Sequence, residues 1–268
     1  MCAGEVWPAI LRSTERGLAS GALQPLETEC VVIEDAGIPF LVRRMVRLEK
    51  KRKVTESQRR EGVNPFLPPA PDLLIGELSD THLAVLNKFN VFPHHLLIVT
   101  RSFEDQEERL TLADFEALCL CMAGYDGLGF YNAGAVAGAS QPHKHLQLVP
   151  VPLGEGRGRT PVDRLIEGRG QLPFRHALSR LGAGDGPEFL CSLYEDLLQA
   201  SAAGDDPYNL LVTRDWMLLV PRSRERFMSM SVNALGFAGS LLTRTTTELD
   251  ELRRLGPMSA LRTTAFPL

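Results

Sequence analysis

The chain has 268 residues, of which 44% are hydrophobic and 23% charged, a composition typical of a globular protein with a sizeable core. Its formal net charge is −4 and its pI is about 5.9, values that exclude the overall basic excess of a duplex DNA-binding protein but allow a local basic pocket for phosphates. No run approaches about 18 consecutive apolar residues and the first residues lack a charged-then-apolar pattern, so we expect neither a membrane span nor a secretion signal.

The five cysteines are scattered along the chain and form no C-x-x-C pair. An odd number at irregular spacing is typical of reduced thiols rather than of a disulfide framework or a zinc site. We therefore expect a cytoplasmic protein.

The first half of the chain is predicted to mix helices with short strands. Residues 1–29 have helical spacing, and a turn at Ala36-Gly37 separates two strands. Residues 50–61 are highly charged, which is typical of a solvated loop, or alternatively of a basic flap over a polyphosphate. Prolines then exclude regular helix from residues 64 to 71.

Thr111 and Asp114 are spaced as an N-cap and an acidic third residue of a helix that runs to about residue 123. The predicted strands cover residues 30–34, 40–45, 74–78, 82–86, 95–100, 130–132 and 143–149.

The second half is predicted to begin in a glycine- and arginine-rich loop at residues 154–159. This loop is the best candidate for a boundary between an N-terminal half, residues 1–153, and a C-terminal half, residues 154–268. A helix is expected at residues 188–202 and a hairpin at residues 208–220. Asn233 is expected to cap one long last helix that ends near Arg254, before Gly256-Pro257.

The segment HKHLQ, residues 143–147, carries the most informative polar pattern in the chain. Side chains alternate between the two faces of a strand, so His143, His145 and Gln147 share one face and Lys144 and Leu146 the other. A row of two imidazoles and an amide is well suited to holding phosphate oxygens.

Small residues precede this strand, from Gly134 to Ser140. Their backbone amides can approach an anion closely, and Ser140 and Gln141 add side-chain donors. Beside His145, these groups could hold an α-phosphate and stabilise the charge that develops on it.

A neutral imidazole is a suitable nucleophile for a phosphorus atom surrounded by anionic oxygens, because it attacks without charge repulsion and can leave again. A carbonyl near His145 could fix the tautomer that leaves the attacking nitrogen unprotonated. Taken alone, the histidines could instead be metal ligands, although no nearby cysteine or acid completes such a site, or ordinary satisfied polar residues.

Several blocks, in the right order, resemble one family. They are residues 86–100 (LNKFNVFPHHLLIVT), 130–134 (FYNAG), 138–147 (GASQPHKHLQ), 208–213 (YNLLVT) and 232–242 (VNALGFAGSLL). Together they are similar to the diadenosine tetraphosphate phosphorylase family, also called ATP adenylyltransferase, of the histidine-triad superfamily. The resemblance spans roughly residues 30 to 244. It implies an α+β fold (α/β in the loose sense): a histidine-triad-like, mostly antiparallel sheet with packed helices.

The resemblance also implies an activity, which is the reversible reaction of diadenosine tetraphosphate with phosphate to give ATP and ADP through an adenylylated histidine. His145 would be the nucleophile, Gln147 would contact the transferred phosphate and His143 would complete the catalytic set. Mg²⁺ would accompany the polyphosphate rather than occupy a protein cage. The matched substrate-binding positions are Lys51, Asn87, Lys88, Asn132, Gly138, Ala139, Ser140, Gln141, Asn233, Ala234, Leu235, Ser240 and Arg244.

Two of these positions, and Phe66 outside them, leave choices open. Arg244 stands where the family usually has lysine, and the two side chains bind phosphate differently. The family lysine of the basic stretch aligns best with Lys51, with Lys50 and Lys53 as alternatives. Phe66 could wall an adenine or belong to a rigid surface loop.

The expected partners are nucleotides and phosphate, with no nucleic acid and no membrane. Gln147 should favour a phosphorylated acceptor over water, because a neutral amide holds phosphate without offering a proton to a leaving group. The alternatives are a hexose-1-phosphate uridylyltransferase-like enzyme, a dinucleoside polyphosphate hydrolase and a nucleotide-binding sensor without turnover. The first lacks its metal-binding cysteine and histidine cluster here, and the last would need no nucleophile.

Overall fold

The computed structural model describes residues 1–46, 64–154, 158–168 and 170–268, and its centre is one eight-stranded sheet. All of its neighbouring strands are antiparallel. Strands from both predicted halves meet where β6 pairs with β9, so the sheet is continuous across them. In spatial order the strands are β3 (Leu74–Glu77), β4 (His82–Leu86), β5 (Leu96–Thr100), β7 (His145–Pro150), β6 (Gly127–Asn132), β9 (Tyr208–Val212), β10 (Trp216–Pro221) and β8 (Ala177–Arg180).

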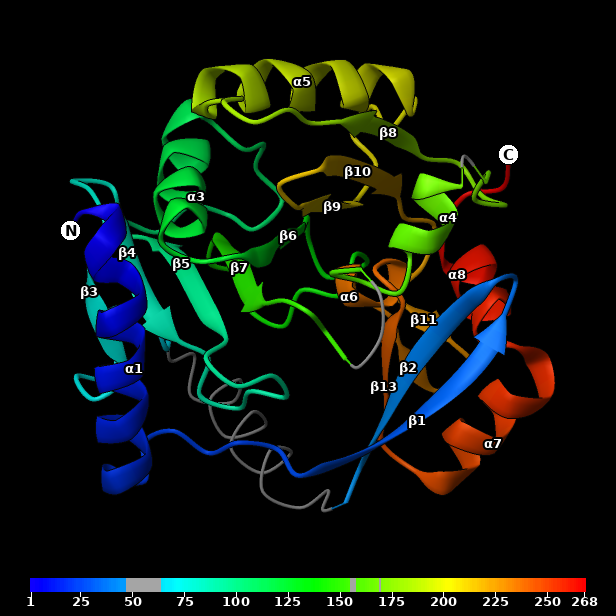
Figure 1. Ribbon diagram of the computed structural model, residues 1–268, viewed down its shortest axis with the longest axis horizontal. Helices are drawn as coiled ribbons and strands as arrows, with labels where there is room; N and C mark the ends of the chain where they lie inside the picture. Colours follow the sequence, from blue (N-terminus) through cyan, green and yellow to red (C-terminus); the bar gives the residue numbers. More distant parts are fainter. Residues whose placement is uncertain (47–63, 155–157, 169) are drawn as a thin grey trace.

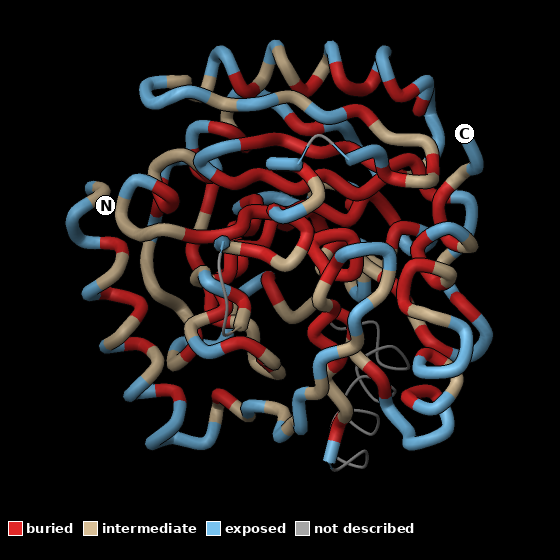
Figure 2. Tube along the Cα trace, turned by 45° about the vertical axis from the view of Figure 1, so that its right-hand side comes forward, coloured by how far each residue is buried: buried red, intermediate tan, exposed pale blue. Residues whose placement is uncertain are grey.

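Three helices cover one face of this sheet: α1 (Ala3–Ser20), α3 (Leu112–Gly124) and α5 (Pro187–Ala200) (Figure 1). Their apolar side chains pack with alternate residues of the central strands, among them Ile98 and Leu146, in one hydrophobic cluster. Figure 2 shows this buried layer running through the middle of the molecule. Burial of such apolar area is the main favourable term in folding.

The opposite face is covered by the C-terminal elements and a smaller sheet. That sheet contains β1 (Thr28–Asp35), β2 (Ile38–Met45) and β13 (Ser240–Thr243), with β13 parallel to β2. Phe130 and Leu211 of the large sheet pack here with Phe40 and Phe237 in a second cluster. The remaining elements of the described residues are α4 (Asp163–Glu167), α6 (Ala234–Phe237), α7 (Thr246–Leu255), α8 (Pro257–Thr264), β11 (Arg226–Phe227) and β12 (Met230–Ser231).

Most predicted elements are confirmed within three residues, but the helical pattern of residues 1–29 forms a helix only over Ala3–Ser20, and β1 already begins at Thr28. The backbone turns at Ala36 and Gly37, which both have positive φ, and α3 begins at the Thr111–Asp114 capping box. The predicted strand from residue 143 begins at His145 instead. The mostly antiparallel sheet with packed helices is the expected α+β fold. Within the described residues, no helix is long and apolar enough to cross a membrane.

The prediction of one long last helix is wrong. The helix that Asn233 caps ends at Phe237, and Gly239 (φ 94°) turns the chain into β13 before α7 and α8 follow. Side chains spaced three and four apart satisfied a helical pattern, but residues 240–243 extend to pair with β2, a tertiary contact that local periodicity does not reveal. The charged stretch of residues 50–61, with Lys51, lies outside the described residues.

Candidate active site

His145 and Gln147 lie on the central strand β7, on the face that is turned away from α1, α3 and α5. Leu146, between them, packs into the helix-side cluster, so the predicted alternation of faces is confirmed. His145 is opposite Val99 of β5, and Gln147 lies between β5 and β6. A strand that is paired on both sides is a rigid support for a reacting group.

The imidazole of His145 is held in one tautomer. Its Nδ1–H donates to the backbone oxygen of His143 at 2.8 Å, which leaves Nε2 unprotonated. Among the described residues, no hydrogen bond is made to Nε2. Burial lowers the pKa of His145 to about 4, although the bond to the His143 carbonyl opposes this shift. His145 is therefore neutral at physiological pH and has the lone pair that a nucleophile needs.

The neighbouring histidine, His143, is hydrogen-bonded on both ring nitrogens. The amide of Asn64 donates to Nδ1 at 2.9 Å, and Nε2–H donates to the backbone oxygen of Thr100 at 2.9 Å. The backbone N–H of Phe66 donates to Asn64 Oδ1, which fixes the orientation of that amide. Burial lowers the pKa of His143. Because both of its nitrogens are engaged, His143 is better suited to orienting His145 than to attacking phosphorus.

A second asparagine–histidine pair, Asn87 and His95, resembles the pair of Asn64 and His143 and orients Gln147. The backbone N–H of Phe89 donates to Asn87 Oδ1, so the Asn87 amide nitrogen faces His95 and donates to its Nδ1 at 3.2 Å. His95 must then carry its proton on Nε2, which donates to Gln147 Oε1 at 3.0 Å. Within the described residues, the amide nitrogen of Gln147 makes no hydrogen bond and can act as a donor on the site face.

Gln106, in the loop before α3, bridges β6 and β7 beyond the point where their ladder ends. Its side-chain oxygen accepts the His145 N–H at 2.8 Å, and its amide nitrogen donates to the backbone oxygens of Asn132 (2.9 Å) and His145 (3.3 Å). The amide thus replaces the direct ladder between the end of β6 and the start of β7. Gln106 is 1% exposed. We infer that it positions His145.

Sequence reasoning did not identify His95 or Gln106 as site residues. His95 lies within a matched block, and a repeated pattern could have indicated it: Asn64-Pro-Phe66 and Asn87-Lys-Phe89 are both Asn-x-Phe turns that orient a histidine. Nothing in the spacing of Gln106 predicts its role, since its contacts depend entirely on tertiary structure.

The small-residue loop uses several of its own amides to close its turn. The backbone N–H groups of Ala137 and Ala139 both donate to the Gly134 carbonyl, and that of Gly138 donates to Ala135. Gly138 has φ 94°, and a side chain there would collide with Asn233 and the Val232 carbonyl. Gly138 is therefore required for close contact between two chain segments, and its contact with substrate remains a prediction, as does that of Ala139.

Ser140 and Gln141 lie at the open end of this loop. Ser140 is exposed and Gln141 half-buried, and within the described part of the chain their side chains make no hydrogen bond. Their hydroxyl and amide groups are thus available to a ligand. This arrangement fits the expected phosphate contacts.

Asn132 joins the N-terminal strands to the segment around Asn233. Its Oδ1 accepts from the backbone N–H of Ala234 at 3.0 Å and from the Asn209 amide at 2.8 Å, which leaves the Asn132 amide nitrogen as its donor. Asn233 caps α6 by accepting from the N–H of Leu235 at 3.1 Å. The structure therefore brings Asn132, Asn233, Ala234 and Leu235 together, and their contacts with substrate remain predictions.

Three other predicted contacts are placed less closely. The Lys88 ammonium lies 5.4 Å from the centre of the Phe89 ring, beside Asn87. Ser240 begins β13 in the smaller sheet, and Arg244 is exposed beyond the end of that strand. Within the described residues, no hydrogen bond or ion pair joins the side chain of Ser240 or Arg244 to the group around His145. Their roles remain predictions.

Aromatic rings line the histidine pair. The Phe66 ring centroid is 5.3 Å from that of His145 and 5.6 Å from that of His143. Phe103 is 56% exposed and its ring centroid is 5.5 Å from that of His143. Phe66 is buried and lies against both imidazoles, within a loop whose following residues, Leu67 and Pro68, are exposed; its contact with an adenine remains a prediction.

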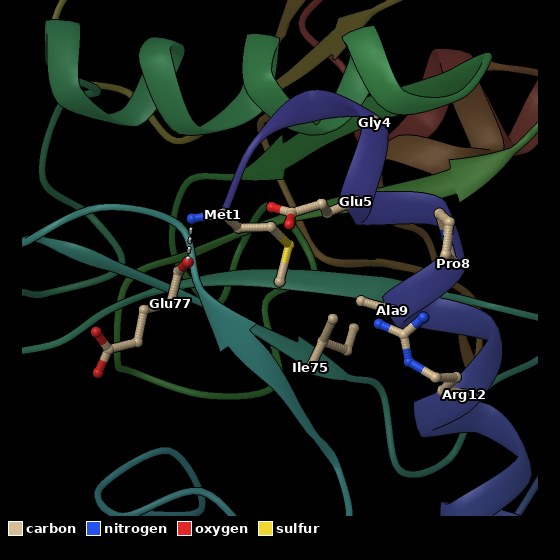
Figure 3. Close-up of a pocket in the computed structure, with 8 residues that line it drawn as sticks. All are labelled: Met1, Gly4, Glu5, Pro8, Ala9, Arg12, Ile75 and Glu77. Carbon is tan, nitrogen blue, oxygen red and sulfur yellow. Dashed lines mark hydrogen bonds between the residues drawn. The ribbon is translucent and has the colours of Figure 1, made fainter.

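A cavity of about 530 Å³ lies elsewhere, between α1 and β3 (Figure 3). Its lining includes Arg12, Ile75 and Glu77, and it contains no residue of the histidine site. The cavity is lined by residues of α1 and β3, together with Met1, and has no histidine in its lining. No group of three or more His, Cys, Asp or Glu side chains within the described residues could hold a metal ion.

Comparisons with known proteins point to one family. Residues 1–168 match the Ap4A phosphorylase N-terminal domain, and residues 170–267 match the ATP adenylyltransferase C-terminal domain. Protein APA1 of Saccharomyces cerevisiae is 26% identical over 269 residues, covering 84% of this chain and 82% of that protein. Diadenosine 5',5'''-P1,P4-tetraphosphate phosphorylase 2 of the same yeast is 27% identical, covering 70% and 71%.

Solved structures share the fold. The crystal structure of yeast Ap4A phosphorylase Apa2 matches all of this chain and 99% of its own, with a TM-score of 0.83 and 22% identity. The same enzyme in complex with Ap4A gives a TM-score of 0.82 at 23% identity, with the same coverage. Its complex with AMP gives 0.81 at 24% identity, covering 100% of this chain and 98% of that one.

Proposed function

The chain belongs to the Ap4A phosphorylase family, and we propose that it catalyses the reversible phosphorolysis of diadenosine tetraphosphate to ATP and ADP. The observation that carries this proposal is the fixed tautomer of His145, whose Nδ1–H is bonded to the His143 carbonyl. An unprotonated, buried Nε2 is the group that a covalent adenylyl transfer needs.

In the first step, His145 Nε2 attacks the α-phosphorus of diadenosine tetraphosphate. A phosphorus–nitrogen bond forms, the bond from that phosphorus to the bridging oxygen breaks, and ATP leaves. The imidazole gains positive charge in this step, and the His143 carbonyl, which accepts from Nδ1–H, stabilises that charge. In the second step, an oxygen of inorganic phosphate attacks the same phosphorus, the phosphorus–nitrogen bond breaks, and ADP leaves with His145 restored.

The neutral amides hold the transferred group. The amide nitrogens of Gln147 and Asn132, with the donors of Ser140 and Gln141, would bind the α-phosphate oxygens and stabilise the negative charge that develops on these oxygens during transfer. Imidazoles and amides dominate the site, and these neutral groups suit Mg²⁺ that arrives with the polyphosphate and neutralises part of its charge. The unpaired cysteines fit the proposed cytoplasmic location.

A direct assay tests this function. The purified protein is incubated with diadenosine tetraphosphate and Mg²⁺, with and without inorganic phosphate, and the nucleotides are separated by chromatography. We expect ATP and ADP only when phosphate is present. AMP and ATP without phosphate would instead identify a hydrolase. No turnover would contradict the proposal and direct the test to UDP-sugars and to nucleotide binding alone.

We predict that His95→Leu lowers kcat by about 10- to 100-fold, the usual effect of removing a group that orients a reacting residue. The amide of Gln147 would lose the bond that directs its nitrogen to the phosphate. His95→Gln retains a donor near the position of Nε2 and should recover part of the loss. Steady-state kinetics of both variants provide the check. Equal kcat values for the leucine and glutamine variants would contradict this role of His95.

A further inference from the structure

A buried arginine lies directly behind the loop of residues 134–139. Arg222 follows β10 and is 1% exposed. Its guanidinium donates almost entirely to oxygen atoms of the backbone, together with one side-chain amide. The partners are Ala137 O (3.3 Å), Asn209 Oδ1 (2.5 Å), Val232 O (2.9 Å), Arg224 O (2.9 Å), Glu225 O (3.4 Å) and Thr264 O (3.1 Å).

Among the described residues, no carboxylate pairs with the charge of Arg222. In the described parts of the chain, no Asp or Glu oxygen lies within ion-pair distance of its guanidinium, whereas the other fully buried cation, Lys144, contacts Asp114 at 3.0 Å and Glu104 at 3.1 Å. Burying an unpaired charge is costly, and carbonyl dipoles offset only part of that cost. Burial lowers the pKa of Arg222 to about 9, with a small opposing influence from Glu225, so the group is still charged at neutral pH.

Hydrogen bonds connect this cation to the candidate site. The Ala137 carbonyl accepts from both Arg222 and the Asn209 amide, and that same amide donates to Asn132 Oδ1 at 2.8 Å. The guanidinium is therefore one hydrogen bond from the backbone of the loop and two from the side chain of Asn132. Water and dissolved ions screen a buried charge much less than a charge on the surface.

We propose that Arg222 supplies a fixed, water-excluded positive charge that attracts the polyphosphate chain of the substrate through the intervening loop, without direct contact. The proposal rests on the proposed function, because it requires the phosphates to bind between the loop of residues 134–139 and His145. It makes Arg222 a determinant of affinity for highly charged nucleotides, and not a catalytic residue.

The charge of the ligand distinguishes this role from a purely structural one. ATP carries more negative charge than AMP, so loss of the Arg222 charge should weaken ATP binding more than AMP binding. For separations on the order of 10 Å in a partly desolvated site, we expect a difference of roughly tenfold. A structural role alone would weaken both nucleotides by a similar factor.

The experiment measures the Kd of AMP and ATP by calorimetry in the 268-residue chain, with His145→Asn present throughout to prevent turnover. Arg222→Gln should reduce the preference for ATP over AMP by about tenfold, and Arg222→Lys, which keeps the charge, should retain most of that preference. Arg214→Gln is the matched control: it removes the same charge from an exposed position beside Asp126, at the far end of β6, and should change neither Kd.

Similar losses for AMP and ATP in Arg222→Gln would overturn the proposal. If that variant does not fold, Arg222→Lys decides. It keeps the charge but cannot reproduce all the hydrogen bonds of the guanidinium, so loss of the preference for ATP in that variant would overturn the proposal. The Kd measurements do not depend on turnover. Failure of the proposed function would appear in the phosphorolysis assay of the unmodified protein, and failure of the Arg222 proposal would appear in the ratio of the two Kd values.

Discussion

His145→Ala is expected to reduce the rate of phosphorolysis by about 10⁴-fold or more, because loss of a nucleophile removes the covalent route altogether. His145 has the only imidazole nitrogen on the site face of β7 that makes no hydrogen bond within the described residues, and its other nitrogen is fixed by the His143 carbonyl. The measurement is the initial rate of ATP and ADP formation, with transfer of labelled adenylyl groups to the protein as a second readout.

The chain offers a matched control for this substitution. His176 makes the same kind of bond, from Nδ1 to the carbonyl two residues earlier, at 2.8 Å from Phe174 O, but lies outside the site. His176→Ala should leave both the rate and the labelling unchanged. A His145→Ala protein that still accumulates covalently bound adenylate would refute the assignment of the nucleophile.

Lys144→Met is expected to destabilise the protein by about 3–5 kcal/mol, because it breaks a buried ion pair and leaves one charge uncompensated. Lys144 is fully buried between the two histidines and points to the helix side of β7, where it contacts Asp114 and Glu104. Burial acts to raise the pKa of Asp114, but the bond to His82 and the charge of Lys144 lower it to about 2. The carboxylate is therefore charged at neutral pH.

Thermal unfolding tests this prediction, and the Tm should fall by roughly 10 °C for a chain of this size. Lys144→Met combined with Asp114→Asn should recover part of the loss, since removing both charges is far less costly than removing one. The control is Arg253→Met, which breaks the exposed pair of Arg253 with Asp250 and should not shift the Tm measurably. A Tm for Lys144→Met within 2 °C of the unmodified protein would contradict a stabilising role for this pair.

Lys144 immediately precedes β7, and its contacts explain why a cation separates two histidines in the sequence. The Lys144 ammonium donates to the Arg109 carbonyl, and its backbone N–H donates to the Glu104 carbonyl. These bonds hold the loop that contains Gln106 against β7. Through Gln106, the ion pair on one face of the strand supports the position of His145 on the other.

Local patterns in the sequence determined much of this protein. Alternation in HKHLQ placed His145 and Gln147 on one face, and the spacing of Thr111 and Asp114 marked the start of α3, because side-chain direction and capping depend on neighbours within four residues. Ordered blocks of sequence were enough to indicate the family. The roles expected for Ser240, Arg244 and Lys51 depend on that resemblance alone.

Tertiary structure decided what depends on groups far apart in the chain. The tautomer of His145 follows from a local carbonyl, but its low pKa follows from burial by the whole fold. The bonds of Gln106 to residues 132 and 145, and those of Arg222 to residues 137 and 209, join segments that no periodicity connects. For the same reason residues 240–243 form a strand and not a helix: their partner is β2, about 200 residues earlier, and only the folded chain brings the two together.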